Sequence, residues 1–301
     1  MSAVVLDHIQ KWYGKEKTIA LKEVSLEVED GELFGLIGPD GAGKSSIFRI
    51  LTTLILPDGG KASVLGKDVV DAYKFIRESV GYMPGRFSLY QDLTVEENLH
   101  FFATVFGTTI EENYDLIKDI YVFLEPFKHR PAGKLSGGMK QKLALCCALI
   151  HQPKVLFLDE PTTGVDPVSR KEFWDMLKRL KSKNITVLVS TPYMDEAGMC
   201  DRVALIHQGK ILAIDSPEGI SKAYPFDLYE VKSDKISVTL NQLRKHISVK
   251  SCYSFGDVLH VSFEKGFTAI NEVLDAITID HLEVKKIEAG VEDSFMAYMT
   301  N

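Results

Sequence analysis

The sequence predicts an α/β fold built on a mainly parallel sheet, followed by a smaller α+β domain. From Val4 to about Tyr224, strand-like and helix-like segments alternate, which is typical of a parallel sheet with helices packed on it. After Pro225 the order becomes β-α-β-β-α-β, which predicts a ferredoxin-like arrangement. We therefore expect a first domain over residues 1–224 and an accessory domain over residues 225–301.

Composition and charge are those of an ordinary globular protein. The chain has 301 residues, of which 45% are hydrophobic and 26% are charged, so it can bury a sizeable core. Its formal net charge of −7 disfavours a general nucleic-acid binder. No apolar run approaches the roughly 18 residues that span a bilayer, and the N-terminus lacks the pattern of an export signal. We therefore expect a cytoplasmic protein with no nucleic-acid partner and no direct membrane insertion.

Short apolar runs predict the buried strands of the first domain. Continuous runs of this length are typical of strands covered on both faces. The runs are Leu33–Ile37, Val155–Leu158 and Ile185–Val189. Later, Gln208 and Gly209 lie between apolar segments and predict the turn of a hairpin.

A helical insertion is predicted between two of these strands, over about residues 92–151. Thr94 and Glu97 have the spacing of a capping box, in which each side chain satisfies a backbone N–H at the start of a helix. The apolar residues that follow fall on one helical face, namely Leu99, Phe102 and Phe106. We therefore expect a helix to begin after Thr94.

The accessory domain is predicted from alternating and helical segments. The expected strands are Leu228–Val231, Val249–Tyr253, Val258–Phe263 and Leu282–Ile287. The expected helices are Ser237–His246, Phe267–Ile277 and a short final one, Glu292–Met299. Its histidines lie on separate elements, so we expect surface or packing roles for His246, His260 and His281. The cysteines lack metal-ligand spacing, so we expect buried, reduced thiols at Cys146, Cys147, Cys200 and Cys252.

A glycine-rich loop follows the strand Leu33–Ile37. Residues Gly38 to Ser45 fit the pattern G-x-x-x-x-G-K-[ST], and a helix is expected to follow. In such a loop, backbone N–H groups and the helix N-terminus bind phosphate oxygens. Lys44 would neutralise the β- and γ-phosphates of ATP, and the Ser45 hydroxyl would ligate Mg²⁺. The predicted nucleotide contacts in this loop are Gly38, Pro39, Asp40, Gly41, Ala42, Gly43, Lys44, Ser45 and Ser46.

An acidic pair ends the strand Val155–Leu158. Asp159 is expected to hold Mg²⁺, directly or through water, and Glu160 to polarise an attacking water. Such a pair is a weak signal alone and a strong one beside a phosphate-binding loop. The predicted catalytic residues are therefore Glu160 and Lys44, and the predicted metal ligands are Ser45 and Asp159.

The segment Leu135–Gln141 opens a helix with a second anion-binding pattern. Ser136, Gly137 and Gly138 bring a hydroxyl and backbone amides to a helix N-terminus. This segment resembles the LSGGQ-type signature of ATP-binding cassette proteins, with Met139 at the variable position. The family also has a glycine-rich loop like the one at Gly38 to Ser45. The resemblance implies a P-loop NTPase fold with a RecA-like parallel core and an antiparallel β subdomain. It also implies a dimer, in which each ATP lies between one subunit's P-loop and the other's signature.

Other segments extend the resemblance over residues 1 to about 220. Tyr13 resembles the aromatic residue that stacks on adenine, and Asp166 lies in a segment that resembles the D-loop, which crosses to the partner subunit. The segments Asp92–Asn98 and Val291–Phe295 resemble those of the exporter subfamily associated with drug or antibiotic efflux. The resemblance implies a separate transmembrane permease subunit and a peripheral position on the inner face of the cell membrane.

Two positions depart from the family pattern. Gly85 stands where the family has a glutamine that contacts Mg²⁺, the attacking water and the membrane subunit. Pro192 stands where the family has a histidine that contacts the γ-phosphate, and proline has neither a side-chain donor nor a backbone N–H. Gln91 comes too late in the pattern for us to expect a replacement.

These departures predict a site that binds ATP and hydrolyses it slowly, since losing one positioned donor lowers the rate by roughly 10²–10³-fold. One hypothesis is that the chain pairs with a different, catalytically complete cassette. The productive site would then combine the partner's P-loop with the signature of this chain. A homodimer with reduced activity is the alternative. Two other classes stay open: a non-hydrolysing ATP-operated regulator, and a soluble cassette ATPase of DNA repair or translation. The acidic balance disfavours the last.

Overall fold

The computed structural model describes residues 2–86, 88–275 and 282–300. It divides into two compact units, Met1–Pro217 and Glu218–Asn301. The division comes earlier than residue 224, the boundary expected from the sequence. The reason is that residues before that boundary bond within the second unit: the Tyr224 hydroxyl lies 2.5 Å from Ser262 Oγ, and the Ser294 hydroxyl donates to the Ile220 carbonyl.

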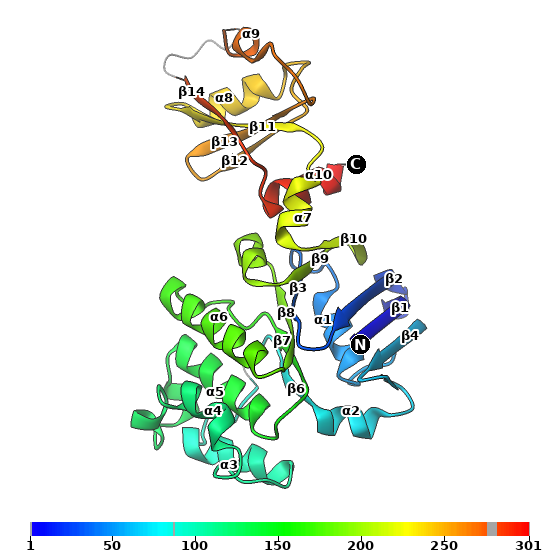
Figure 1. Cartoon of the computed structure of the whole chain (residues 1–301), viewed down its shortest axis with the longest axis vertical. Coiled ribbons are helices and arrows are strands. Elements are labelled where there is room, and N and C mark those ends of the chain that lie inside the picture. Colours follow the sequence, from blue (N-terminus) through cyan, green and yellow to red (C-terminus); the bar gives the residue numbers. More distant parts are fainter. Residues whose placement is uncertain (1, 87, 276–281, 301) are drawn as a thin grey trace. The chain divides into compact units, whose positions relative to one another are not determined.

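A six-stranded sheet forms the centre of the first unit (Figure 1). Its order is β10-β9-β3-β8-β7-β6, with β10 antiparallel to β9 and the other pairs parallel. The strands are β3 (Leu33–Ile37), β6 (Val80–Met83), β7 (Val155–Asp159), β8 (Thr186–Thr191), β9 (Arg202–His207) and β10 (Lys210–Asp215). Every residue of β3, β7 and β8 is buried, so the strands predicted from apolar runs are confirmed.

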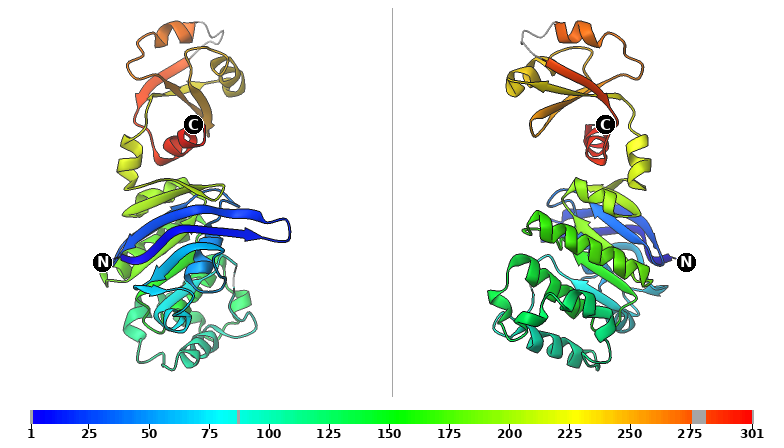
Figure 2. Two further views of the ribbon diagram at one scale, coloured as in Figure 1. Left: turned by 90° about the vertical axis from the view of Figure 1, so that its right-hand side faces the viewer. Right: turned by 60° about the vertical axis from the view of Figure 1, so that its left-hand side comes forward.

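A second, antiparallel sheet has the order β2-β1-β4-β5. Its strands are β1 (Ser2–Tyr13), β2 (Thr18–Glu29), β4 (Gly59–Val64) and β5 (Lys67–Asp68). Figure 2 shows the long β1–β2 hairpin extending to one side of this unit. A continuous apolar cluster joins this sheet to one face of the six-stranded sheet and includes Val4, Leu26, Phe48, Phe157 and Leu188. The antiparallel β subdomain is therefore present as predicted.

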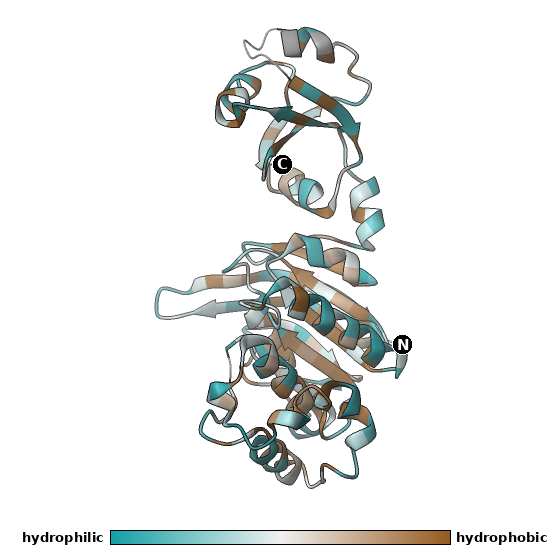
Figure 3. Ribbon diagram, turned by 90° about the vertical axis from the view of Figure 1, so that its left-hand side faces the viewer, coloured by the Kyte–Doolittle hydropathy of each residue, from teal (hydrophilic) through white to brown (hydrophobic). Residues whose placement is uncertain are grey.

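Helices complete the first unit and cover the central sheet. They are α1 (Lys44–Leu51), α2 (Tyr73–Ser79), α6 (Pro167–Ser182) and the 3-10 segment η3 (Met194–Met199). The next helix, α7 (Pro217–Lys222), belongs to the second unit from Glu218 on. Figure 3 shows hydrophobic residues concentrated on the central strands, while outer helices carry hydrophilic ones. The α6 face that packs on the sheet buries Phe173, Trp174 and Leu177. The Gln208–Gly209 hairpin is confirmed, since both residues have the positive φ of a tight turn (46° and 75°).

The helical insertion is also present. It contains α3 (Val95–Val105), α4 (Tyr114–Tyr121), η1 (Glu125–Phe127), η2 (Ala132–Lys134) and α5 (Gly137–Leu149). The capping box is confirmed: Glu97 N–H donates to Thr94 Oγ1 at 3.2 Å, and Thr94 N–H donates to Glu97 Oε2 at 2.8 Å. The sequence predicted this start correctly because capping is a local interaction.

The second unit contains an antiparallel sheet of order β12-β13-β11-β14, which is the ferredoxin-like order predicted from the sequence. Its elements are β11 (Asp227–Ser233), α8 (Ile236–Leu243), β12 (Ser251–Phe255), β13 (Val258–Phe263), α9 (Ile270–Asp275), β14 (Leu282–Ile287) and α10 (Val291–Thr300). The end expected for the second helix, Ile277, lies outside the described residues. Leu243, Leu259 and Phe263 belong to the core of this unit.

His246, His260 and the four cysteines have the structural roles expected of them. His260 Nδ1 lies 2.7 Å from Asp293 Oδ1, and His246 Nδ1 accepts from Ser248 N–H. His281 lies outside the described residues. All four cysteines are buried free thiols, and burial raises the pKa of each. Among the described residues, no helix combines the length and the apolar character needed to cross a bilayer.

Candidate nucleotide-binding site

The glycine-rich loop connects β3 to α1 at the carboxyl edge of the central sheet. Gly38 N–H donates to the Thr191 carbonyl at 3.2 Å, which ties the start of the loop to the end of β8. A Cβ at Gly38 would lie 2.1 Å from the Ile206 carbonyl oxygen, so only glycine fits there. Gly43, at the N-cap of α1, has φ +110°, a conformation that residues with a Cβ rarely adopt. The loop therefore ends with the free N–H groups of a helix N-terminus, which favour a bound anion.

Lys44 places its ammonium group inside this loop. Its Nζ donates to the carbonyls of Gly38 at 2.7 Å and Pro39 at 3.0 Å, and it lies 3.1 Å from Glu160 Oε1. The Lys44 side chain is only 3% exposed. A buried cation held by backbone carbonyls is oriented before any phosphate arrives, so its charge is preorganised for phosphate binding.

The carboxyl end of β7 brings two acidic residues to the same edge. Asp159 Oδ1 accepts a hydrogen bond of 2.6 Å from Ser190 Oγ on β8. Glu160 N–H donates to the same hydroxyl at 3.0 Å, and Glu160 has φ +51°. A left-handed backbone is uncommon for a residue with a Cβ and recurs at functional sites. Burial, aided by the nearby Asp159 carboxylate, raises the pKa of Tyr82 to about 12.

A cavity of about 160 Å³ lies beside these groups. The residues that line it are Ala20, Gly41, Gly43, Lys44, Ser45, Ser46 and Glu160. At its margin, the Tyr13 hydroxyl lies 3.1 Å from Ser46 Oγ, and Tyr13 is 40% exposed. An exposed ring anchored to the loop can stack on a base while the loop holds its phosphates. The structure thus brings together Tyr13, the loop, and Glu160.

The side chains present fit ATP and Mg²⁺, both of which a nucleotide loop of this type implies. A Cβ at Gly41 meets nothing within 4 Å, so the loop faces open space where phosphates would lie. The Ser45 hydroxyl lines the cavity, and the Asp159 carboxylate is anchored by Ser190. These oxygen donors suit Mg²⁺, which uses one or two protein ligands together with substrate phosphates.

Positions 85 and 192 lie beside this site. A Cβ at Gly85 would be 3.0 Å from the Asp159 carbonyl oxygen and 3.8 Å from its Cγ, so a side chain at Gly85 would start next to the Asp159 carboxylate. Pro192 directly follows Thr191, whose carbonyl holds Gly38. Both substituted positions therefore adjoin the predicted site. Gln91 is held elsewhere: its carbonyl accepts from Gly133 N–H in η2.

The signature segment begins α5, as predicted. Ser136 is the N-cap, and its Oγ accepts from Met139 N–H at 3.4 Å. A Cβ at Gly138 would lie 2.8 Å from Ser169 Oγ, so this glycine allows the close approach of α6. Asp166 caps α6 by accepting from Ser169 N–H at 3.0 Å, and that bond lowers the Asp166 pKa. The signature and the segment expected to cross to a partner are thus neighbours.

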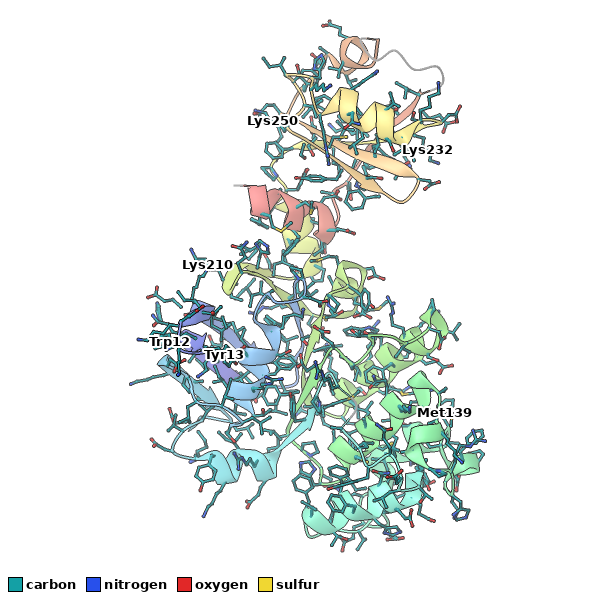
Figure 4. The ribbon with its side chains drawn as sticks, turned by 180° about the vertical axis from the view of Figure 1, so that it is seen from behind. Trp12, Tyr13, Met139, Lys210, Lys232 and Lys250 are labelled. Carbon is teal, nitrogen blue, oxygen red and sulfur yellow. The ribbon has the colours of Figure 1, made fainter. Side chains whose placement is uncertain are left out.

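The two anion-binding segments are well separated within the chain. Figure 4 shows Tyr13, beside the P-loop cavity, and Met139, in the signature, on opposite sides of the first unit. None of the residues that line the P-loop cavity comes from the signature. The structure therefore does not bring Ser136, Gly137 or Gly138 to this chain's own Lys44.

Comparison with known proteins identifies the family. Residues 21–163 match the family described as ABC transporter. The chain is 39% identical over 225 residues to the Nod factor export ATP-binding protein I of Rhizobium sp. (strain N33), and the match covers 73% of each protein. The chain belongs to the ABC transporter family.

Other ABC proteins support this assignment and the fold. The chain is 43% identical over 203 residues to the probable multidrug ABC transporter ATP-binding protein YbhF of Escherichia coli (strain K12). That match covers 67% of the chain but only 35% of the relative. A dimeric ATP-binding cassette solved in a post-hydrolysis state with ADP and Pi superposes with a TM-score of 0.64 at 26% identity, covering 71% of this chain and 98% of that one. The predicted P-loop NTPase fold is confirmed.

Two contacts were not predicted from the sequence, one at the site itself and one outside the nucleotide cavity. Ser190 joins Asp159 to Glu160, and its signal was a hydroxyl residue near the end of an otherwise apolar strand. Arg170, in the first turn of α6, reaches the segment that follows Pro192. No local pattern indicates that contact, because it joins residues from different elements.

Proposed function

We propose that the chain is the ATP-binding subunit of an ABC exporter, driven by closure of two cassettes around ATP. One observation carries this proposal: the chain has a complete P-loop and a complete signature, and they lie on opposite sides of one unit. A single chain therefore offers two half-sites, and a second cassette would complete each. The names of the relatives, Nod factor export and multidrug transport, support export as the direction.

In this function the residues divide into binding and catalytic groups. Tyr13 would stack on adenine, while Gly38 to Ser46 and the Lys44 ammonium would hold the phosphates. Ser45 and Asp159 would hold Mg²⁺, which draws charge from the phosphate oxygens when it is bound. The Glu160 carboxylate would orient the attacking water. Its contact with Lys44, 3.1 Å, keeps it at the phosphate end of the cavity.

A partly apolar groove offers a place for the separate permease subunit. It has a volume of about 460 Å³ and is lined by parts of β6, α3 and α5, together with the segment that surrounds Gly85. Leu54 and Val105, both in its lining, are 55% and 61% exposed. Exposed apolar side chains around a groove are typical of a protein–protein contact. Docking there would place the chain as a peripheral protein on the cytoplasmic face of the membrane.

We further propose that the chain's own ATP site is catalytically weak. Gly85 and Pro192 adjoin Asp159 and Thr191 but supply no side-chain donor to the transition state. An asymmetric dimer follows, in which the Ser136 signature serves the ATP bound by a catalytically complete partner. A homodimer with slow turnover is the alternative. The same two residues favour a second candidate function, an ATP-operated regulator in which binding alone closes the dimer.

The proposal is tested with the purified full chain. Equilibrium ATP binding, steady-state hydrolysis with Mg²⁺ and sedimentation with ATP are measured together. Tight binding with little hydrolysis is expected. Failure to bind ATP would overturn the proposed function. Hydrolysis at rates ordinary for enzymes, about 1–10³ per second, would overturn the weak-site proposal and favour a self-sufficient homodimer.

Mixing experiments separate the remaining alternatives. The Gly85→Gln/Pro192→His variant, further changed at Ser136→Ala, carries a repaired P-loop site and a weakened signature. Adding wild-type chain should raise its hydrolysis, because the wild-type signature can complete the repaired site. Adding the Ser136→Ala single variant is the matched control and should not. No rise with the wild type would contradict the asymmetric arrangement and favour the regulator.

A further inference from the structure

A buried ion pair joins the first turn of α6 to the segment after β8. Arg170 Nε lies 3.7 Å from Glu196 Oε1, and Arg170 Nη1 lies 3.6 Å from Asp195 Oδ2. The Arg170 guanidinium also lies over the Tyr193 ring, 4.2 Å from its centre. The Glu196 side chain is 3% exposed and that of Arg170 is 23% exposed. One arginine therefore contacts three residues of the segment that begins at Pro192.

This ion pair is not hydrogen-bonded. Both distances exceed the hydrogen-bond range. Arg170 Nε and Glu196 Oε1 are buried, and neither has a hydrogen-bond partner among the described residues. Buried charged groups usually acquire such partners, because leaving them unpaired is unfavourable. The pair can therefore gain a charge-assisted hydrogen bond if α6 and this segment approach by a fraction of an ångström.

The Glu196 end of the pair connects to the P-loop. Glu196 Oε2 accepts from Thr191 Oγ1 at 2.5 Å, and the same hydroxyl accepts from Tyr193 N–H at 3.0 Å. The Thr191 carbonyl in turn holds Gly38 N–H. Phosphates bound in the loop would therefore influence the position of the Glu196 side chain through Thr191.

The Arg170 end connects to the expected dimer contact. Arg170 N–H donates to the Asp166 carbonyl at 2.9 Å, in the turn that Asp166 caps. Val168, in the same turn, is 69% exposed. Further along α6, Lys181 Nζ lies 2.6 Å from Asp201 Oδ1, so the two segments are fixed together there. The helix is thus closely ion-paired near one end and loosely paired at the end expected to contact a partner.

We propose that Arg170 and Glu196 are positioning residues that couple nucleotide binding at the P-loop to the first turn of α6, and so to the partner cassette. This inference rests on the proposed function. Pro192 removes the side chain that would otherwise link the end of β8 to the nucleotide. The pair supplies a different path between the same regions: P-loop, Thr191, Glu196, Arg170, Asp166. Coupling between sites is reciprocal, so ATP should alter the first turn of α6 even in a single chain.

Hydrogen–deuterium exchange of the full chain tests this coupling. The exchangeable backbone amides within residues 167–172 (Pro167 has none) are followed with and without Mg-ATP, and ATP affinity is measured alongside. In the wild type, ATP should change the exchange of these amides. In Arg170→Gln that change should shrink at least about fivefold, the lower end of ordinary coupling between sites. ATP affinity should stay within about twofold, because Arg170 does not line the nucleotide cavity.

Companion variants separate positioning from folding. Arg170→Lys keeps the charge and should retain much of the response, while Glu196→Gln should behave like Arg170→Gln and also covers the case in which the latter does not fold. Glu172→Gln is the matched control: Glu172 is also on α6, and its carboxylate pairs with Lys142 at 2.7 Å instead of with the segment after β8. It should keep the wild-type response.

The outcomes distinguish this inference from the proposed function. A wild type that does not bind ATP contradicts the proposed function itself. A wild type that binds ATP without any change in residues 167–172, or an Arg170→Gln variant that responds like the wild type, overturns the coupling alone. Equal loss of response in Glu172→Gln would also overturn it, since α6 would then be responding to any lost ion pair.

Discussion

The carboxyl edge of the central sheet carries two kinds of strand end. The ends of β3 and β7 lead into Lys44 and Glu160, which lie 3.1 Å apart, and into an Asp159 carboxylate anchored by Ser190. The ends of β6 and β8 lead into Gly85 and Pro192, which carry no side-chain donor. All four ends belong to one sheet and adjoin one site. In the proposed function, the first pair of ends binds phosphate, and the second pair lies where the family resemblance implies transition-state contacts.

In the proposed function, ATP binding and ATP turnover therefore depend on groups at the ends of different strands. Loop geometry and a preoriented cation are enough to hold phosphates. Acceleration requires additional groups whose contacts strengthen in the transition state. A chain can therefore keep the first capability while it loses much of the second. The predictions below test that separation, in order of decreasing expected effect.

Lys44→Ala should weaken ATP binding most. It removes a buried cation from the phosphates and leaves Glu160 without its ion-pair partner. Truncating one member of a buried charged pair typically weakens binding by about 30-fold to more than 10³-fold. Isothermal titration with ATP measures the loss, and Lys44→Arg tests whether charge alone is sufficient. Binding within threefold of the wild type would contradict the role assigned to Lys44.

Gly85→Gln/Pro192→His should raise hydrolysis by about 10²-fold or more while ATP affinity changes little. The glutamine must displace its surroundings slightly, because its Cβ would lie 3.0 Å from the Asp159 carbonyl oxygen. Gly85→Ala/Pro192→Ala carries the same Cβ without the donors and is the matched control. Steady-state phosphate release measures both. A similar rise in the two variants would show that the effect comes from replacing Gly85 and Pro192 as such, and not from restoring the side-chain donors.

Ser190→Ala should lower the free energy of unfolding by about 1–3 kcal/mol, because it removes a buried hydroxyl from Asp159 and from Glu160 N–H. It should also lower the rate of hydrolysis in the Gly85→Gln/Pro192→His background, since the Asp159 carboxylate and the Glu160 backbone lose a common anchor. Urea unfolding and phosphate release give the two readings. Loss of stability with full activity would leave Ser190 a purely structural role.

Thr94→Ala should lower the free energy of unfolding by about 1 kcal/mol, the usual effect of losing a helix N-cap. The cap lies in the helical insertion, away from the P-loop cavity, so ATP binding should be unchanged. Thr94→Ser keeps the hydroxyl and serves as the control. Urea unfolding with and without ATP checks both statements, and an altered ATP affinity would show that the insertion influences the P-loop.

The smallest effect is expected from pH. The hydrogen bond from Thr94 N–H lowers the pKa of Glu97 below its ordinary value of 4.5. A carboxyl group whose pKa is lower in the folded state stabilises the fold above its unfolded pKa and loses that contribution as the pH falls through the folded pKa. The melting-temperature difference between wild type and Glu97→Gln should therefore be present at pH 7 and decrease as the pH falls below 4.5. A constant difference would contradict this role for the capping box.

Much of the molecule follows from local sequence. The buried strands are recognisable because both faces of the sheet are covered, so their apolar runs are unbroken. The capping box and the Gln208–Gly209 turn are recognisable because their contacts lie within a few residues. The division between the two compact units comes earlier than the sequence predicts, and the bond from Tyr224 to Ser262, a residue far along the chain, has no local signal.

By itself, the sequence determined the family, the strand–loop–helix proposed to hold phosphates, the signature at the start of α5 and the absence of side-chain donors at Gly85 and Pro192. These features are short and continuous, and backbone geometry and side-chain chemistry specify them locally. Only the tertiary structure decided that Ser190 anchors the Asp159 carboxylate and the Glu160 backbone N–H, that a side chain at Gly85 would adjoin Asp159, and that Arg170 faces Glu196. Each of these contacts joins residues from different elements, and the packing of those elements determines which side chains meet.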